Sequence, residues 1–125
     1  MSVQLNHTIV HAHDRDGTAA FYCQLLGLPD PVPFGPFLSV DLANGVTLDF
    51  AEHGGTVASQ HYAFLVDEDE FDVILGRLKA QDLTYYADPG HQRAGEHNTN
   101  DGGRGLDWSD PTGHNLEILT RPYGG

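Results

Sequence analysis

The fold of this chain is decided near its end by the stretch DWSDPTGHNLEIL, Asp107–Leu119. A short strand leads into the turn Asp-Pro-Thr-Gly, where proline fixes φ for the second residue and glycine accepts the conformation that closes the turn. The chain then returns as a strand in which Leu116 and Ile118 share one face and Glu117 lies on the other. A carboxylate at that position must be solvated, paired with a cation or bound to a metal.

The first half of the chain predicts one strand, one helix and a hairpin. Alternation of side chains predicts a strand within 3–12, and Asp14 or Asp16 is expected to cap a helix that ends at Gly27. Four prolines between 29 and 36 exclude a helix there and restrict any strand to a sheet edge. Asn44-Gly45 then joins strands over 37–42 and 46–51.

The same order recurs in the second half. We expect a strand over 61–66, a helix over about 68–80 capped by Asp67, and strands over 84–87, 106–108 and 115–120. The sequence therefore predicts an α+β fold in a single domain, 1–125. The domain consists of two βαβββ units, about 1–56 and 57–125, whose sheets surround a shared concavity.

The amino-acid composition excludes several classes of partner for this protein. A formal net charge of −12, with only six Lys and Arg, argues against a nucleic-acid partner. The same charge argues against substrates with several negative charges, unless the few arginines converge on one site. The single cysteine, Cys23, excludes an internal disulfide and suits a reducing cytoplasm, and no apolar run is long enough to span a membrane. We therefore expect a cytoplasmic protein that contacts no membrane.

Each repeat offers a histidine on its first strand and a carboxylate on its last. These pairs are His7 with Asp49, and His61 with Glu117. Two imidazoles and one or two carboxylates form a ligand set for Zn²⁺, Fe²⁺, Mn²⁺ or Ni²⁺ that leaves positions open for a substrate. Side chains that are simply solvated on an acidic surface remain the alternative.

Four segments together resemble the vicinal oxygen chelate superfamily, the glyoxalase/bleomycin resistance protein/dioxygenase proteins. The segments are LNHTIV (5–10), FYCQLLGL (21–28), HYAF (61–64) and DPTGHNLE (110–117), of which the last is the most specific. The resemblance implies paired βαβββ modules that form a cup-shaped mixed sheet, in a homodimer with sites near the subunit interface. It also places the metal ligands of the family at His7, His61 and Glu117, with Asp49 where glyoxalases carry a fourth carboxylate.

The resemblance leaves two functions open. The first is sequestration of an aromatic natural product, such as a bleomycin-like or enediyne-like drug, by an antibiotic-resistance protein of this size and charge. Aromatic and loop side chains would then contact the ligand: Phe34, Phe37, Tyr85, Tyr86, Arg93, His97 and Trp108. The alternative is a divalent-metal enzyme, a glyoxalase-like lyase, thiol transferase or dioxygenase, that acts on a chelating substrate. The sequence identifies no catalytic acid or base outside the ligand set.

Overall fold

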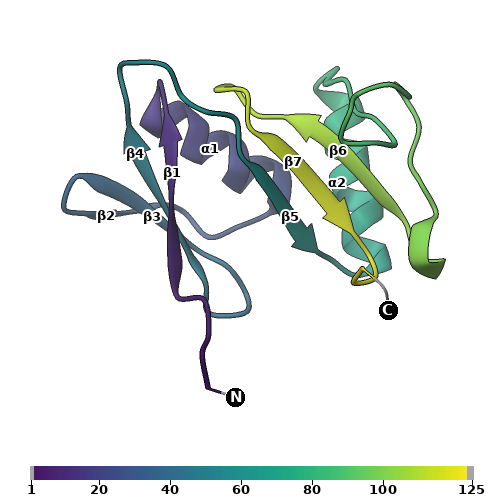
Figure 1. Ribbon diagram of the computed structural model, residues 1–125, viewed down its shortest axis with the longest axis horizontal. Coiled ribbons are helices and arrows are strands. Elements are labelled where there is room, and N and C mark those ends of the chain that lie inside the picture. The colour runs from purple at the N-terminus through teal and green to yellow at the C-terminus, as the bar shows by residue number, and fades with distance from the viewer. Residues whose placement is uncertain (1, 124–125) are drawn as a thin grey trace. The chain divides into compact units, whose positions relative to one another are not determined.

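The computed structural model describes residues 2–123, so positions 1 and 124–125 of the expected domain lie outside the described residues. The chain divides into two compact units, Met1–Ala58 and Ser59–Gly125. Each unit contains one sheet and one long helix (Figure 1). This arrangement confirms the predicted α+β class with βαβββ units.

The first unit carries a four-stranded sheet and one helix. Its elements are β1 (His7–Ala12), α1 (Arg15–Leu26), β2 (Val32–Phe34), β3 (Phe37–Asp41) and β4 (Thr47–Glu52). The strand order is β1-β4-β3-β2, with β1 parallel to β4 and the other pairs antiparallel. The proline-rich segment thus forms the edge strand β2, as the sequence predicts. Tyr22 of α1 packs edge-on against Phe50 of β4, with ring centroids 4.8 Å apart, and this contact holds the helix on the sheet.

The second unit carries a three-stranded sheet. Its elements are β5 (His61–Leu65), α2 (Glu68–Ala80), a short 3-10 helix η1 (Asn100–Gly102), β6 (Gly105–Ser109) and β7 (Asn115–Leu119). The order is β5-β7-β6, so β7 is the central strand, parallel to β5 and antiparallel to β6. Within the described residues, neither helix combines the length and apolar character needed to cross a bilayer.

The expected strand over 84–87 is reduced to an isolated bridge at Tyr86. Its backbone N–H and C=O both bond to Asp107 of β6, at 2.8 Å each. The next residue, Ala87, donates instead to Arg93 within the following loop, at 3.0 Å. In an antiparallel pair the backbone groups of the flanking residues point to the other side, and here they bond to the following loop, so the pairing with β6 stays a single bridge.

Both long helices begin at the predicted caps. Asp14, rather than Asp16, caps α1 and accepts a bond from the Gly17 N–H at 3.0 Å. The helix ends at Gly27 in the left-handed region, with φ 68°, a conformation that glycine adopts without steric cost. Asp67 caps α2 in a reciprocal capping box with Glu70. The fold of both units is therefore specified locally at these positions.

The turn between β6 and β7 is organised by one buried carboxylate. Asp110 Oδ1 accepts three backbone N–H bonds, from Thr112 at 2.9 Å and from Gly113 and His114 at 2.8 Å each. Gly113 has φ 107°, a value that side chains rarely tolerate. The turn fixes the register of β6 against β7, which places Asp107 directly opposite Glu117.

Candidate functional site

The two units hold their predicted histidine and carboxylate at equivalent positions. In the first unit, His7 pairs across the parallel strands with the residue two before Asp49. In the second unit, His61 pairs with the residue two before Glu117. The repeat that the sequence indicates is therefore present in the strand register itself.

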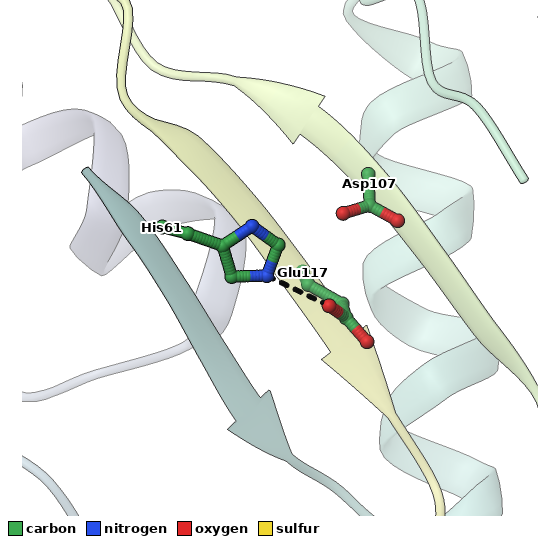
Figure 2. A group of neighbouring side chains, drawn as sticks. All are labelled: His61, Asp107 and Glu117. Carbon is green, nitrogen blue, oxygen red and sulfur yellow. Dashed lines mark hydrogen bonds and ion pairs between the residues drawn. The ribbon is translucent and has the colours of Figure 1, made fainter. Parts of the chain in front are cut away.

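The second unit brings three metal-binding side chains together. His61 on β5, Asp107 on β6 and Glu117 on β7 each offer one ligand atom, and these atoms lie within 4.8 Å of one another. Figure 2 shows the three side chains converging from neighbouring strands, with the His61 Nε2–Glu117 Oε1 contact at 2.8 Å. One imidazole and two carboxylates suit the divalent ions that the sequence suggests.

Asp107 is the side chain that makes the two units differ as candidate cation sites. In the first unit, the residue opposite the carboxylate of Asp49 is Ser39, whose Oγ donates to Asp49 Oδ1 at 2.6 Å. In the second unit, the equivalent residue is Asp107, opposite Glu117. A hydroxyl satisfies a carboxylate, whereas a second carboxylate repels it unless a proton or a cation lies between them.

Burial increases the free-energy cost of keeping these two carboxylates charged side by side. Asp107 is 1% exposed and Glu117 is 4% exposed. Burial raises the pKa of the Asp107 carboxyl group, and the charge of Glu117 raises it further, although the hydrogen bond from Asn115 lowers it. Two desolvated acids beside an imidazole fit a divalent cation, whose charge would offset the repulsion.

Neighbouring polar side chains fix the orientation of these groups. The Asn115 amide nitrogen donates to Asp107 Oδ2 at 2.7 Å and lies 3.0 Å from His61 Nδ1. Because a carboxylate only accepts, the amide oxygen of Asn115 faces the other way and accepts from His91 Nε2 at 2.7 Å. The Tyr123 hydroxyl donates to both oxygens of Glu117 at 3.1 Å. Such partners orient ligands around a metal.

Asp107→Asn is expected to stabilise the metal-free protein at neutral pH, with a Tm a few degrees higher. The wild-type carboxyl group has a raised pKa, so its charge disfavours the folded state above that pKa, and the penalty disappears as the pH falls below the unfolded value. The advantage of the variant should therefore grow from pH 4 to pH 7 in urea denaturation with chelator present. Asp41→Asn, an exposed strand position, should show no such gain, and an equal gain there would contradict the assignment.

The first unit holds its predicted residues around a groove of its own sheet. A depression of about 550 Å³ is lined by His7, Asp49 and Phe34, together with Val32 and Pro33. His7 is exposed at the start of β1, and its Nδ1 lies 2.7 Å from the Asn6 side-chain oxygen. The structure thus groups two predicted metal ligands with one predicted aromatic contact, and their roles remain predictions.

The other predicted ligand contacts are spread over the fold. Phe37 is half-buried on β3 and Tyr85 is half-buried before the bridge. Tyr86 stacks on His91, with ring centroids 4.1 Å apart and planes 3° from parallel. His97 is exposed, and its ring forms an edge contact with the ring of Phe71, with centroids 6.0 Å apart.

Arg93 and Trp108 have contrasting positions. Arg93 lines a pocket beside Asp107 and Glu117. Trp108 is 1% exposed and belongs to the core, because alternate residues of a strand share a face and Leu106 and Trp108 point away from Asp107. In this structure Trp108 therefore supports the site from behind, rather than presenting its ring to a ligand.

Asp107, Asn115 and Tyr123 are the site residues that sequence analysis did not identify. A signal for Asp107 was present, since it alternates with the apolar residues Leu106 and Trp108 and lies opposite Glu117 once the turn closes. Asn115 and Tyr123 carried no such signal, because their bonds depend on the three-strand register and on the path of the chain after β7.

Two solved structures are similar to this chain over nearly its whole length. The protein named Oxidase ChaP-H1 is 62% identical, covers 99% of this chain and 100% of its own, and has a TM-score of 0.97. Oxidase ChaP-H2 is 58% identical, covers 100% of this chain and 98% of its own, and has a TM-score of 0.97.

More distant matches show the fold alone. A glyoxylase/bleomycin resistance protein/dioxygenase domain from Frankia sp. EAN1pec has a TM-score of 0.74 at 18% identity, over 100% of this chain and 96% of its own. No protein-family model and no curated protein matched the chain.

Proposed function

Since the chain belongs to the vicinal oxygen chelate superfamily, we propose that it is a metal-dependent oxidase of a small aromatic substrate. The substrate would carry two adjacent oxygens, as in a vicinal diol, a hydroxycarbonyl or an enediol. The observation that carries this proposal is the convergence of His61, Asp107 and Glu117 in one unit. The names of the two similar oxidases support it.

The residues that would hold the metal are His61, Asp107 and Glu117. Bound there, a divalent ion would polarise the chelating oxygens of the substrate and, if it is iron or manganese, would supply the redox centre for reaction with dioxygen. The family pattern adds His7, and Asp49 as a fourth carboxylate. Titration of His7→Ala and Asp49→Asn with metal tests those two positions.

The protein itself contributes orientation. The amide of Asn115 contacts both Asp107 and His61, and the Tyr123 hydroxyl donates to Glu117. Burial of the Tyr123 hydroxyl raises its pKa, and its bond to Glu117 raises it further, so the group keeps its proton and remains a donor at neutral pH. These contacts limit the rotamers of the ligands before any ion arrives.

Sequestration is the second candidate function, and the groove of the first unit is the observation that favours it. That groove joins the apolar side chains Val32 and Phe34 to the acidic Asp30, Asp41 and Asp49, a combination that suits a cationic aromatic ligand. In this function the ligand would bind without being changed.

Metal analysis with an oxygen-uptake assay distinguishes the two functions. Protein purified without chelator is analysed for metal and titrated with Fe²⁺, Mn²⁺, Zn²⁺ and Ni²⁺. Oxygen uptake is then followed with a panel of aromatic vicinal diols and hydroxyquinones. We expect one ion per chain and oxygen uptake that depends on Fe²⁺ or Mn²⁺. Tight binding of aromatic ligands with no oxygen uptake at any metal loading would favour sequestration instead.

Gel filtration tests the homodimer that we also propose.

A further inference from the structure

A small pocket in the second unit places arginines next to the proposed metal ligands. The cavity measures about 170 Å³, and Asp107, Glu117 and Tyr123 form one part of its lining. Arg93, Arg104 and Arg121 also line it, so three of the six basic residues of a −12 chain meet there. Four carboxylates line the pocket as well, Asp88, Asp101, Asp107 and Glu117, so acceptance of an anionic group depends on a basic side chain that these acids do not engage.

Two of the three arginines are already engaged. Arg104 Nε lies 2.8 Å from Glu68 Oε1, its Nη2 lies 2.9 Å from Asp72 Oδ1, and its guanidinium covers the Phe71 ring. Arg93 pairs with Glu96 at 3.2 Å on the surface. These two side chains build the wall of the pocket and have little positive charge left to offer.

Arg121 differs from both. Within the part of the chain that the structure describes, it forms neither an ion pair nor a side-chain hydrogen bond, although the pocket lining includes Asp101 and Asp88. Asp88 is committed to the backbone N–H groups of Gln92 and Arg93. Among the basic groups on this lining, the Arg121 guanidinium is therefore the one without a bonded partner in the described part of the chain.

The side chain of Arg121, an exposed residue, lies close to two glycines of the preceding loop. An added Cβ on Gly103 would come within 2.8 Å of Arg121 Cγ, and one on Gly102 would lie 3.7 Å from its Nη1. The aliphatic stem thus rests against two glycines, where any larger residue at 103 would displace it. A guanidinium positioned in this way presents parallel N–H donors, which match the two oxygens of a carboxylate.

We propose that this pocket binds a carboxylate of the substrate, with Arg121 as its anchor. The inference rests on the proposed function, because the metal would hold the adjacent oxygens of the same molecule. A volume of about 170 Å³ corresponds to roughly five or six water molecules, which is room for a carboxylate together with one small ring. The substrate class is therefore an aromatic chelator that also carries one acid group.

Calorimetry with a matched pair of probes tests this assignment. The probes are 3,4-dihydroxybenzoate and its neutral counterpart 3,4-dihydroxybenzamide, each titrated into Zn²⁺-loaded protein. We expect the acid to bind about tenfold or more tightly than the amide, as a hydrogen bond to a charged group contributes. Arg121→Gln should abolish this preference and leave the affinity for the amide unchanged, and Arg121→Lys should restore part of it. Lys79→Gln, which removes the same charge away from the pocket, should keep it.

The outcomes separate this inference from the proposed function. An unchanged preference in Arg121→Gln, or no preference in the wild type, overturns the carboxylate site even when metal binds. If no Zn²⁺ binds, the proposed function fails. Benzoate and benzamide titrated into metal-free protein then decide the carboxylate site, since a preference that Arg121→Gln removes supports it and its absence overturns it.

Discussion

Glu117→Gln is expected to lower oxygen uptake by about a thousandfold and metal affinity by at least about a hundredfold. A metal acting on substrate oxygens contributes several kcal/mol to the transition state, which corresponds to about a thousandfold in rate. Removing a charged ligand should weaken the metal more than the 10–100-fold typical of supporting residues. Glu117 is 4% exposed and touches both His61 and Tyr123, so glutamine, which keeps one acceptor oxygen but replaces the other with an NH2 donor, also weakens the contacts of these two side chains.

The variant should remain folded, because Leu116 and Ile118 on either side of Glu117 supply the packing of β7. Circular dichroism checks the fold, metal content is measured by mass spectrometry, and oxygen uptake is measured at saturating Fe²⁺. Glu52→Gln, an exposed strand position outside both cavities, is the matched control and should behave as wild type. Full oxygen uptake by Glu117→Gln would exclude a metal role for this carboxylate.

Asp110→Ala is expected to reduce the free energy of unfolding by about 3 kcal/mol, as judged from hydrogen bonds to charged groups. The carboxylate is 5% exposed and accepts the N–H groups of Thr112, Gly113 and His114. Without it these donors lose their acceptor in the turn between β6 and β7. For a domain whose total stability is about 5–15 kcal/mol, this is a large loss, and equilibrium unfolding in urea measures it.

Asp110→Asn provides the matched comparison. Its side-chain oxygen still accepts bonds but carries no charge, so we expect a loss of about 1 kcal/mol. The turn also sets the β6–β7 register, and a slip of one residue would move Glu117 to the opposite face of the sheet. Metal affinity in Asp110→Ala should therefore fall together with stability. A loss below about 1 kcal/mol in Asp110→Ala would show that the turn does not depend on this carboxylate.

The features that sequence analysis predicted correctly are those fixed by nearby residues. The caps Asp14 and Asp67, the end of α1 at Gly27 and the last hairpin each depend on side chains within a few positions of the backbone they stabilise. The central position of Leu116 and Ile118 in the core follows from strand alternation alone. Local chemistry was sufficient for the fold class.

The features that it missed depend on pairings between distant segments. The strand expected over 84–87 shrinks to an isolated bridge at Tyr86, which pairs with Asp107 about twenty residues further along, while the N–H of Ala87 bonds to the loop at Arg93. Trp108, a predicted ligand contact, lies in the core, and Asp107, which lies opposite Glu117, is not among the predicted site residues. Alternation in β6, once anchored by Leu106 in the core, gives the correct assignment.

The contact between His61 and Glu117 was also beyond local analysis. It requires β5 to lie beside β7 in one particular parallel register, across more than fifty residues of sequence. The sequence predicts a histidine and a carboxylate in each repeat. It does not indicate in which repeat the two side chains lie in contact. Ser39 in one unit and Asp107 in the other make that difference.

Ser39 and Asp107 occupy equivalent positions, so the two units of this chain can be compared directly at that position. Two halves share one backbone plan, and each half can change its side chains without disturbing the other's ladder of hydrogen bonds. Opposite the acid of its last strand, the first unit has the neutral Ser39, whose hydroxyl donates a hydrogen bond to that acid. The second unit has Asp107 there, which is a second acid. The residue at that one position therefore distinguishes the two units in their suitability for a cation.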